Sequence, residues 1–292
     1  MRHIAFLSTN NLEGFVVDDE LAIAPLAVRG WQVKTVSWRQ PCDWSQFEIV
    51  IIRSTWDYQN DVHRFLRVLE EINASGAILL NDLELVNWNI EKTYLQELRA
   101  KGNAIVRTIW EKSLPASEVL RGYFQRLETN EIIIKPLVSA NADFTYRLLE
   151  IDIDSIFPEL QAVFALRPFM VQPFMQKIIS EGEYSLFYFA GKYSHAILKT
   201  PKKYDFRVQE EHGGYIKSVQ PEPVLLEQSD HVLASLPART LYARLDFVRK
   251  DAGDFEIMEV ELIEPALYFR TDVNSAERFA EAVSAWVFAL KK

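Results

Sequence analysis

Short apolar runs alternate with amphipathic ones over about the first ninety residues. Runs of strand length stand at residues 3–9, 31–38, 47–54 and 77–81. The segments 19–30 and 62–76 have helical periodicity, and each ends at a glycine. Strands separated by helices of this kind predict a parallel sheet that is covered on both faces. Sites form at the carboxyl ends of such strands, and the sequence reads RSTWDY, Arg53–Tyr58, at one of these ends.

The pattern changes after about residue 88, where alternating runs come in pairs. One hairpin is expected at 183–200, around an Ala-Gly-Lys turn, and a second at 243–265. The other expected elements are helices at 89–102 and 275–292 and strands at 131–136 and within 169–178. Lys92 falls near the start of the first of these helices. Antiparallel hairpins with flanking helices predict an α+β unit after the α/β region.

Composition restricts the partners and the compartment. The net charge of −9 speaks against nucleic acid or an anionic membrane surface as a partner, because phosphate polymers attract basic proteins. The single cysteine, Cys42, allows no internal disulfide, and no apolar run reaches the length of a membrane helix. With no cleavage signal near the N-terminus, we expect a cytoplasmic protein. Neither a G-x-G-x-x-G nor a P-loop motif occurs, which speaks against Rossmann and Walker nucleotide sites.

Two carboxylates interrupt an otherwise apolar strand near the C-terminus. Strict alternation puts them, Glu259 and Glu261, on the face of Phe255, Ile257 and Ile263, opposite Met258, Val260 and Leu262. The neighbouring strand of the hairpin would bring Asp246 close to them, beside Arg244. Buried acids need a shared proton, a basic partner or a cation, and three acids without Cys or His suit Mg²⁺ or Mn²⁺. A solvated strand edge, or neutralisation by Arg244 alone, would also explain the pattern.

Basic and small polar residues supply two further candidate groups. Lys135 ends a buried strand whose ladder Pro136 prevents from continuing, so its ammonium could reach an anion in a cleft. The polar loop that follows could close over phosphate oxygens through Ser139, Asn141 and Thr145. A basic cluster comprises Lys199, Lys202, Lys203 and Arg207. This cluster could supply charge to a polyanionic ligand, although solvated termini and loops would also account for both groups.

Taken in order, these pieces resemble the ATP-grasp superfamily and, within it, the glutathione-synthetase-like ligases. The order is a helix lysine, a strand ending in Lys-Pro, a polar loop, VQPFM, a hairpin, YDFRVQEEHGG and an Asp followed by Glu-x-Glu. More narrowly, RSTWDY, KPLVSANADFTYR and EVELIEPALYF resemble the group of the cycloserine-pathway O-ureido-D-serine cyclo-ligase. The resemblance implies an α/β pre-ATP-grasp domain at 1–87, a subdomain with a lid loop at 88–171 and a subdomain with a metal site at 172–292.

The resemblance also implies roles for single residues. Lys92 and Lys135 would contact the phosphates of ATP, beneath a lid formed by Ser139, Asn141 and Thr145. Adenine would lie against the hinge Gln172, Pro173, Phe174 and Met175, and ribose against Glu183. Asp246, Glu259 and Glu261 would hold Mg²⁺ or Mn²⁺, while Arg207 and Arg244 would be catalytic. Candidates for the substrate pocket are Arg53, Trp56, Asp57 and Lys199, although RSTWDY could equally be a structural turn.

The chemistry that the resemblance implies is ADP-forming ligation of a carboxylate and an amine through an acylphosphate, either between molecules or within one. An ATP-grasp phosphotransferase and a non-catalytic nucleotide-binding protein are the alternatives. The sequence departs from the superfamily pattern at Glu261, where many relatives have Asn, and in a lid loop without glycine. Tyr184 and Ser185 follow Glu183 where glutathione synthetase has a basic residue, which speaks against glutathione synthesis. The oligomeric state, a homodimer included, stays open.

Overall fold

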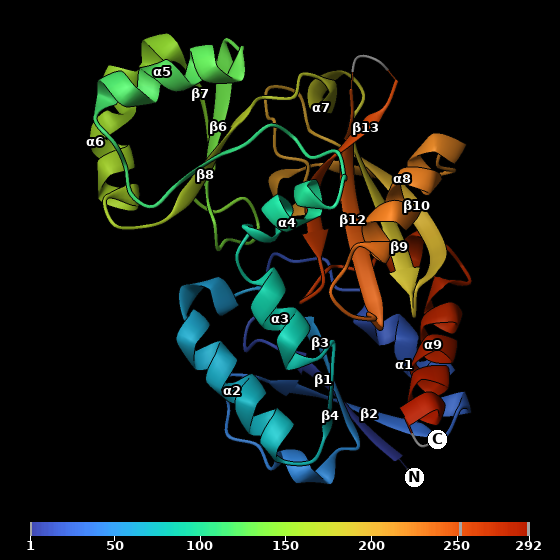
Figure 1. The fold of residues 1–292 in the computed structure, drawn as a ribbon. Coiled ribbons are helices and arrows are strands. Elements are labelled where there is room, and N and C mark those ends of the chain that lie inside the picture. Colours follow the sequence, from blue (N-terminus) through green and yellow to red (C-terminus); the bar gives the residue numbers. More distant parts are fainter. Residues whose placement is uncertain (1, 251–252, 291–292) are drawn as a thin grey trace.

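The computed structural model describes residues 2–250 and 253–290, and three β-sheets organise them (Figure 1). The N-terminal sheet has the order β2-β1-β3-β4, with all strands parallel. Its strands are β1 (Arg2–Ser8), β2 (Trp31–Ser37), β3 (Ile49–Ser54) and β4 (Ile78–Leu80). The parallel sheet expected from the first ninety residues is therefore confirmed.

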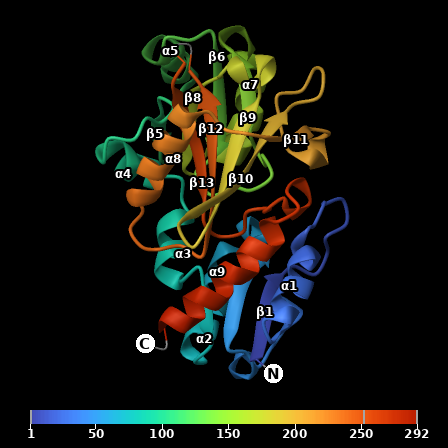
Figure 2. The same ribbon diagram turned by 90° about the vertical axis from the view of Figure 1, so that its right-hand side faces the viewer.

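Helices cover both faces of the N-terminal sheet, because side chains alternate along its strands. Helix α2 (Val62–Ala74) packs on one face, where Ala5 and Leu7 of β1 join its core. Helices α1 (Ile23–Val28) and α9 (Ser275–Leu290) pack on the other face, against Ile4 and Phe6. Figure 2 shows α9 beside α1, so the last helix of the chain completes the first sheet.

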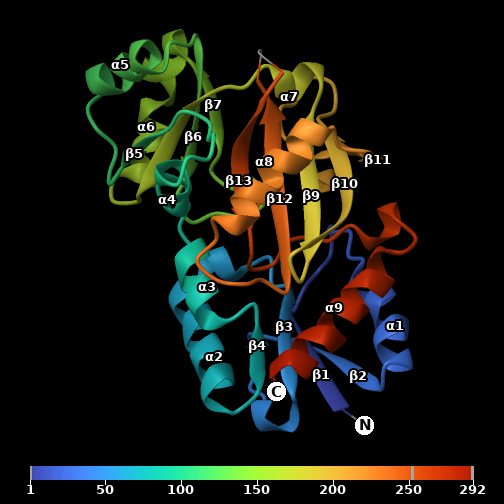
Figure 3. The same ribbon diagram turned by 45° about the vertical axis from the view of Figure 1, so that its right-hand side comes forward.

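The second sheet is antiparallel, with the order β11-β10-β9-β12-β13. Its strands are β9 (Glu183–Phe189), β10 (Lys192–Thr200), β11 (Tyr215–Val219), β12 (Tyr242–Arg249) and β13 (Phe255–Glu261). Both predicted hairpins are present, although part of the second turn, 251–252, lies outside the described residues. Ala190 and Gly191 have φ values of 47° and 79°, which matches a two-residue turn between twisted strands. Helices α4 (Tyr94–Ala100) and α8 (Pro223–Ala234) cover one face, and α8 is prominent in Figure 3.

The third sheet has the order β5-β8-β6-β7 and is antiparallel. Its strands are β5 (Ile109–Glu111), β6 (Glu131–Pro136), β7 (Tyr146–Leu149) and β8 (Phe169–Pro173). Helices α5 (Ser117–Leu127) and α6 (Ile153–Phe164) pack on one face. The other helices are α3 (Leu83–Asn89), α7 (Lys177–Ser180) and short 3-10 turns at 19–22, 44–46, 58–60, 150–152, 210–212 and 269–271. Strand β8 crosses the boundary expected between 171 and 172, and both domain boundaries stay predictions.

The sequence predicted that Lys92 lies near the start of a helix, but in the structure Lys92 lies between two helices. The segment expected as one helix divides between the end of α3 at Asn89 and the start of α4 at Tyr94. The backbone N–H of Lys92 instead donates to the carbonyl of Leu137, 3.0 Å away. This bond fixes the connector to the loop after β6. Within the described ranges, no helix is long and apolar enough to span a bilayer.

Strand β13 contains one residue more than its partner strand β12. Asp246 pairs with Glu259 and Phe247 pairs with Ile257, so Met258 is the extra residue of a β-bulge. A bulge reverses the inward and outward alternation of the residues on either side of it. The strict alternation predicted for this strand is therefore wrong.

Burial on the two sides of the bulge shows the correction. Phe255 and Ile257, expected on the face of the glutamates, pack with Val260 in the core beneath α4 and α8. Met258, expected on the opposite face, lines a cavity together with Glu259. Glu259 and Glu261 consequently lie on the polar face of the sheet. The apolar residues of the same strand point to the opposite face, into the hydrophobic core.

Candidate active site

One large cavity lies between the second and third sheets, on the face of each that helices leave open. Ile133 and Lys135 of β6 line one wall, and side chains of β9, β10, β12 and β13 line the other. The cavity brings together these residues expected in the site: Trp56, Lys92, Lys135, Ser139, Asn141, Thr145, Gln172, Pro173, Phe174, Met175, Glu183, Lys199, Arg207, Arg244, Asp246, Glu259 and Glu261. Their individual roles stay predictions.

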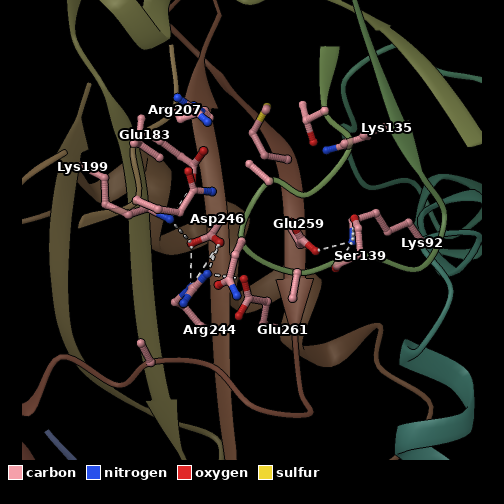
Figure 4. A pocket seen from close by; sticks show the side chains of 18 of the residues that line it. Lys92, Lys135, Ser139, Glu183, Lys199, Arg207, Arg244, Asp246, Glu259 and Glu261 are labelled. Carbon is pink, nitrogen blue, oxygen red and sulfur yellow. Dashed lines mark hydrogen bonds and ion pairs between the residues drawn. The ribbon is translucent and has the colours of Figure 1, made fainter. Parts of the chain in front are cut away.

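A row of alternating charges crosses the second sheet (Figure 4). Lys199 Nζ lies 2.5 Å from Glu183 Oε1 and 3.4 Å from Asp246 Oδ1. Arg244 Nη2 lies 3.0 Å from Asp246 Oδ2 and also pairs with Glu261. The strand register explains this row, because Asp246 stands between β9 and β13 in the sheet. Each acid in the row has at least one basic neighbour.

The two acids that share Arg244 differ in pKa. Burial by itself would raise the pKa of Asp246, but Arg244 and Lys199 outweigh burial and hold that pKa below its ordinary value. The Ser185 hydroxyl also donates to Asp246. Burial raises the pKa of Glu261 to about 7, because Arg244 only partly offsets it and the nearby acids repel its charge. Asp246 is therefore the firmly ionised member of the row.

A further ion pair, apart from the row, links the two sides of the cavity. Lys92 Nζ lies 3.0 Å from Glu259 Oε1 and donates to the carbonyl oxygen of Ser139, 3.1 Å away. Burial acts to raise the pKa of Glu259, but Lys92 and Lys135 outweigh it and the pKa is lowered. Lys92 thus holds the loop after β6 and the acid of β13 at the same time.

Lys135 is a cation of the cavity that has no direct partner in the part of the chain that the structure describes. Its ammonium forms no hydrogen bond or ion pair with any described residue, although Lys92 and Arg244 each form several. Burial lowers the pKa of Lys135, with partial compensation from Glu259. A half-buried ammonium without a partner is costly, and an anion in the cavity would remove that cost.

The acids fit a hard cation in their chemistry, and their present contacts restrict how one could bind. In the described part of the chain, no three His, Cys, Asp or Glu side chains are close enough to hold a metal ion together. Arg244 and Lys92 occupy the positions beside Glu261 and Glu259. Mg²⁺ commonly takes one or two carboxylates, with phosphate oxygens and water completing its shell. Glu259, together with either Asp246 or Glu261, could provide two carboxylates for Mg²⁺, and a nucleotide could provide the phosphate oxygens.

The loop after β6 closes over one side of the cavity without any glycine. Asn141, Ala142 and Phe144 adopt positive φ values of 54°, 59° and 52°, a conformation that glycine usually provides. The Asn141 amide donates to the Trp56 carbonyl, 3.4 Å away, and His212 Nε2 lies 3.1 Å from the Asn141 carbonyl. The loop therefore touches both the RSTWDY segment and the loop that carries Arg207.

Two of the residues expected to shape the substrate pocket lie outside the cavity. Arg53 is fully buried, pairs with Asp19 at 3.0 Å and donates to the Pro265 carbonyl at 2.8 Å. Asp57 accepts a 2.7 Å hydrogen bond from Trp38 Nε1 and pairs with Arg39. Both contribute to a structural turn, the alternative that the sequence left open. Trp56, between them, does line the cavity.

Sequence reasoning missed Glu264, Tyr58 and Tyr268, which also line the cavity. Glu264 follows β13 in a loop, where no alternation indicates the direction of a side chain. Burial, with Glu261 nearby, raises the pKa of Glu264 to about 8. Its position three residues after the second glutamate of the Glu-x-Glu pair was the one available signal.

Comparison with known proteins agrees with this geometry. Residues 4–81 match the family described as the N-terminal domain of the D-cycloserine synthetase DcsG. The cycloserine biosynthesis protein DcsG of Streptomyces lavendulae is 27% identical over 255 residues, which cover 83% of this chain and 84% of that protein.

Solved structures share the fold over nearly the whole chain. D-cycloserine synthetase DcsG has a TM-score of 0.87 at 22% identity, covering 97% of this chain and 99% of that one. D-alanine–D-alanine ligase from Bacillus anthracis has a TM-score of 0.72 at 14% identity, covering 99% and 98%. The ATP-grasp ligase PsnB with its minimal precursor has a TM-score of 0.67 at 16% identity, covering 97% and 99%. The chain thus has the fold of ATP-grasp ligases, and its predicted resemblance to the cycloserine-pathway group is confirmed.

Proposed function

We propose that this protein is an ATP-dependent, ADP-forming carboxylate–amine ligase that acts on a small amino-acid-like substrate. The observation that carries the proposal is the unpartnered Lys135 ammonium, which shares a cavity with a row of acids. An anion would satisfy Lys135, and a divalent cation would suit the acids. Mg·ATP supplies both charges in one ligand, and the neighbouring solved structures include ATP-grasp ligases.

In this reaction a substrate carboxylate oxygen attacks the γ-phosphorus of ATP, and the bond to the β-phosphate oxygen breaks to release ADP. An amine nitrogen then attacks the acylphosphate carbon, inorganic phosphate leaves with its bonding electrons, and the nitrogen loses a proton. Likeness to D-cycloserine synthetase favours a version in which the amine belongs to the same molecule and a ring closes. The substrate itself is what the proposal leaves to experiment.

The protein would contribute mainly position and charge. Lys135 and Lys92 would neutralise phosphate oxygens from two sides, and Glu183 would accept hydrogen bonds from ribose. Arg207 would stabilise the charge that develops on the transferred phosphoryl group. Asp246 or Glu261, with Glu259, would hold Mg²⁺ or Mn²⁺, which supplies further neutralisation of phosphate charge when bound.

The test is an ADP-release screen in Mg·ATP, with carboxylates offered with and without amines. Mass spectrometry of the products separates a ligase, which yields an amide and free phosphate, from a phosphotransferase, which yields a phosphorylated acceptor. Lys135→Met should lower kcat/KM roughly 100-fold or more, as loss of one preorganised charge does elsewhere. Lys217→Met, at an exposed position of β11, is the matched control. Absence of both ADP release and an ATP-induced rise in Tm would refute the proposal.

A further inference from the structure

The segment 262–265, which leaves β13 toward the N-terminal sheet, has a backbone fixed by distant side chains. Each of its carbonyl oxygens accepts a hydrogen bond from a buried or half-buried side chain. The four bonds are Asn81 Nδ2 to Leu262 O (2.7 Å), Tyr242 Oη to Ile263 O (2.8 Å), Trp56 Nε1 to Glu264 O (2.9 Å) and Arg53 Nη2 to Pro265 O (2.8 Å). A loop held at every carbonyl presents its side chains in fixed directions.

The Glu264 side chain lines the cavity from this fixed loop, and no Lys, Arg or His in the described ranges forms an ion pair with it. Among described residues, the nearby acids Glu183, Asp246, Glu259 and Glu261 each form an ion pair, whereas Glu264 forms none. Its polar contact is the Tyr58 hydroxyl. Glu264 therefore differs from the row of acids on the sheet, whose charges are already compensated.

Two aromatic side chains lie beside Glu264. Trp56 and Tyr58 line the same cavity, and Tyr58 is the polar neighbour of the Glu264 carboxyl group. The Trp56 indole is held by its bond to the Glu264 carbonyl. A carboxylate among aromatic faces suits an organic ammonium group, which gains both a charge-assisted hydrogen bond and cation–π attraction. A divalent metal ion would need several oxygen ligands, and within the described ranges no three acidic side chains, Glu264 included, lie close enough to hold one together.

We infer that Glu264, with Trp56 and Tyr58, forms the subsite that binds an ammonium group of the substrate. The inference rests on the proposed function and narrows its substrate class to amino acids that keep a free, positively charged amino group. An ammonium has no lone pair, so the group bound at Glu264 is recognised and does not attack the acylphosphate. A second nitrogen, in the same molecule or in another, is the nucleophile.

The experiment is the ADP-release screen with matched pairs of carboxylates. Each L- and D-amino acid in the panel is paired with its des-amino or 2-hydroxy counterpart, and kcat and KM are measured for wild type, Glu264→Gln and Glu264→Asp. For an ammonium-bearing substrate, Glu264→Gln should raise KM roughly 10- to 100-fold, the range expected for loss of a charge-assisted hydrogen bond. Glu264→Asp, which keeps the charge, should recover part of the loss.

The Tm shift caused by Mg·AMPPNP reports whether each variant still folds and binds nucleotide, and it should be unchanged in Glu264→Gln. Glu70→Gln, at an exposed position of α2, is the matched control for KM. A substrate without an amino group that wild type uses as well as its amino counterpart would overturn the inference and leave the ligase intact. An unchanged KM in Glu264→Gln would do the same. If no carboxylate releases ADP, the proposed function fails and this subsite fails with it.

Discussion

Replacing Glu264 by glutamine should stabilise the ligand-free protein, and the gain should grow as pH rises. Burial raises the pKa of Glu264 to about 8 in the folded state, and an unfolded glutamate titrates near its ordinary 4.5. Below the unfolded pKa the carboxyl is protonated in both states and costs nothing. Between these pH values the unfolded chain releases the proton while the folded chain retains it, so wild-type stability falls. Glutamine, which has the same shape and no proton to release, escapes this loss.

The magnitude follows from the gap between the two pKa values. At about 1.4 kcal/mol for each pH unit, this gap sets an upper limit of about 5 kcal/mol, reached near pH 8. Glu264 is only half-buried, and screening by water in the cavity reduces the figure. We therefore expect a gain of roughly 2 kcal/mol, equivalent to a rise in Tm of roughly 5 °C for a chain of this size.

The assay is thermal unfolding followed by circular dichroism at pH 5, 6.5 and 8, without nucleotide or substrate. The Tm of Glu264→Gln should match that of wild type at pH 5 and exceed it increasingly at pH 6.5 and 8. Glu70→Gln, which alters an exposed carboxylate of α2, should follow wild type throughout. A difference in Tm that is independent of pH, or a variant less stable than wild type at pH 8, would refute the reasoning.

Three further predictions concern the acids, a buried histidine and the RSTWDY segment. Asp246→Asn and Glu259→Gln should each abolish ATP turnover with far-UV circular dichroism unchanged, and full turnover by both would remove the metal assignment. Burial lowers the pKa of His195 to about 4 from 6.5, so stability should be complete above pH 6.5 and fall by up to about 3 kcal/mol by pH 4. His195→Gln should flatten that dependence in urea titrations, and an equally steep slope would contradict it. Arg53→Met, which leaves Asp19 without its partner, should cost roughly 3 kcal/mol in the same titrations, and a change below about 0.5 would contradict the buried pair.

Local patterns predicted the fold and part of the cavity lining, because there the pattern coincides with its physical cause. Alternation along 242–249 predicted Arg244 and Asp246 on the opposite face from Leu245 and Phe247. In the structure, Arg244 and Asp246 line the cavity, and Leu245 and Phe247 pack in the core. The Ala190-Gly191 turn fixed the first hairpin, and with it the register of the strand that carries Glu183. Where side-chain direction follows from strand period, the sequence was sufficient.

The errors arose where distant contacts decide the outcome. A bulge at Met258 adds one residue, and an apolar residue there looks the same inside a regular strand or at a bulge. For Arg53 the sequence left a pocket role and a structural turn open, and the distant contacts with Asp19 and the Pro265 carbonyl, which hold it in the interior, favour the turn. The backbone position of Glu264 depends on a hydrogen bond from Trp56 Nε1, which is 208 positions away in the chain. Sequence spacing contains no record of such pairs.

In the proposed reaction, the ion pairs that neutralise the acids of the cavity would couple the binding of nucleotide to the binding of the metal ion. Lys92 cannot contact phosphate and remain on Glu259 at full strength, and a metal ion on Glu259 competes with the same ammonium. In the proposed reaction, nucleotide that drew Lys92 away would free the carboxylate for the metal, and metal on the carboxylate would free Lys92 for the nucleotide. Thermodynamic linkage makes this exchange reciprocal, so each ligand should tighten the binding of the other by the same factor. Free ATP and free Mg²⁺ would then be poor ligands separately, and the protein would respond to their complex as a single signal.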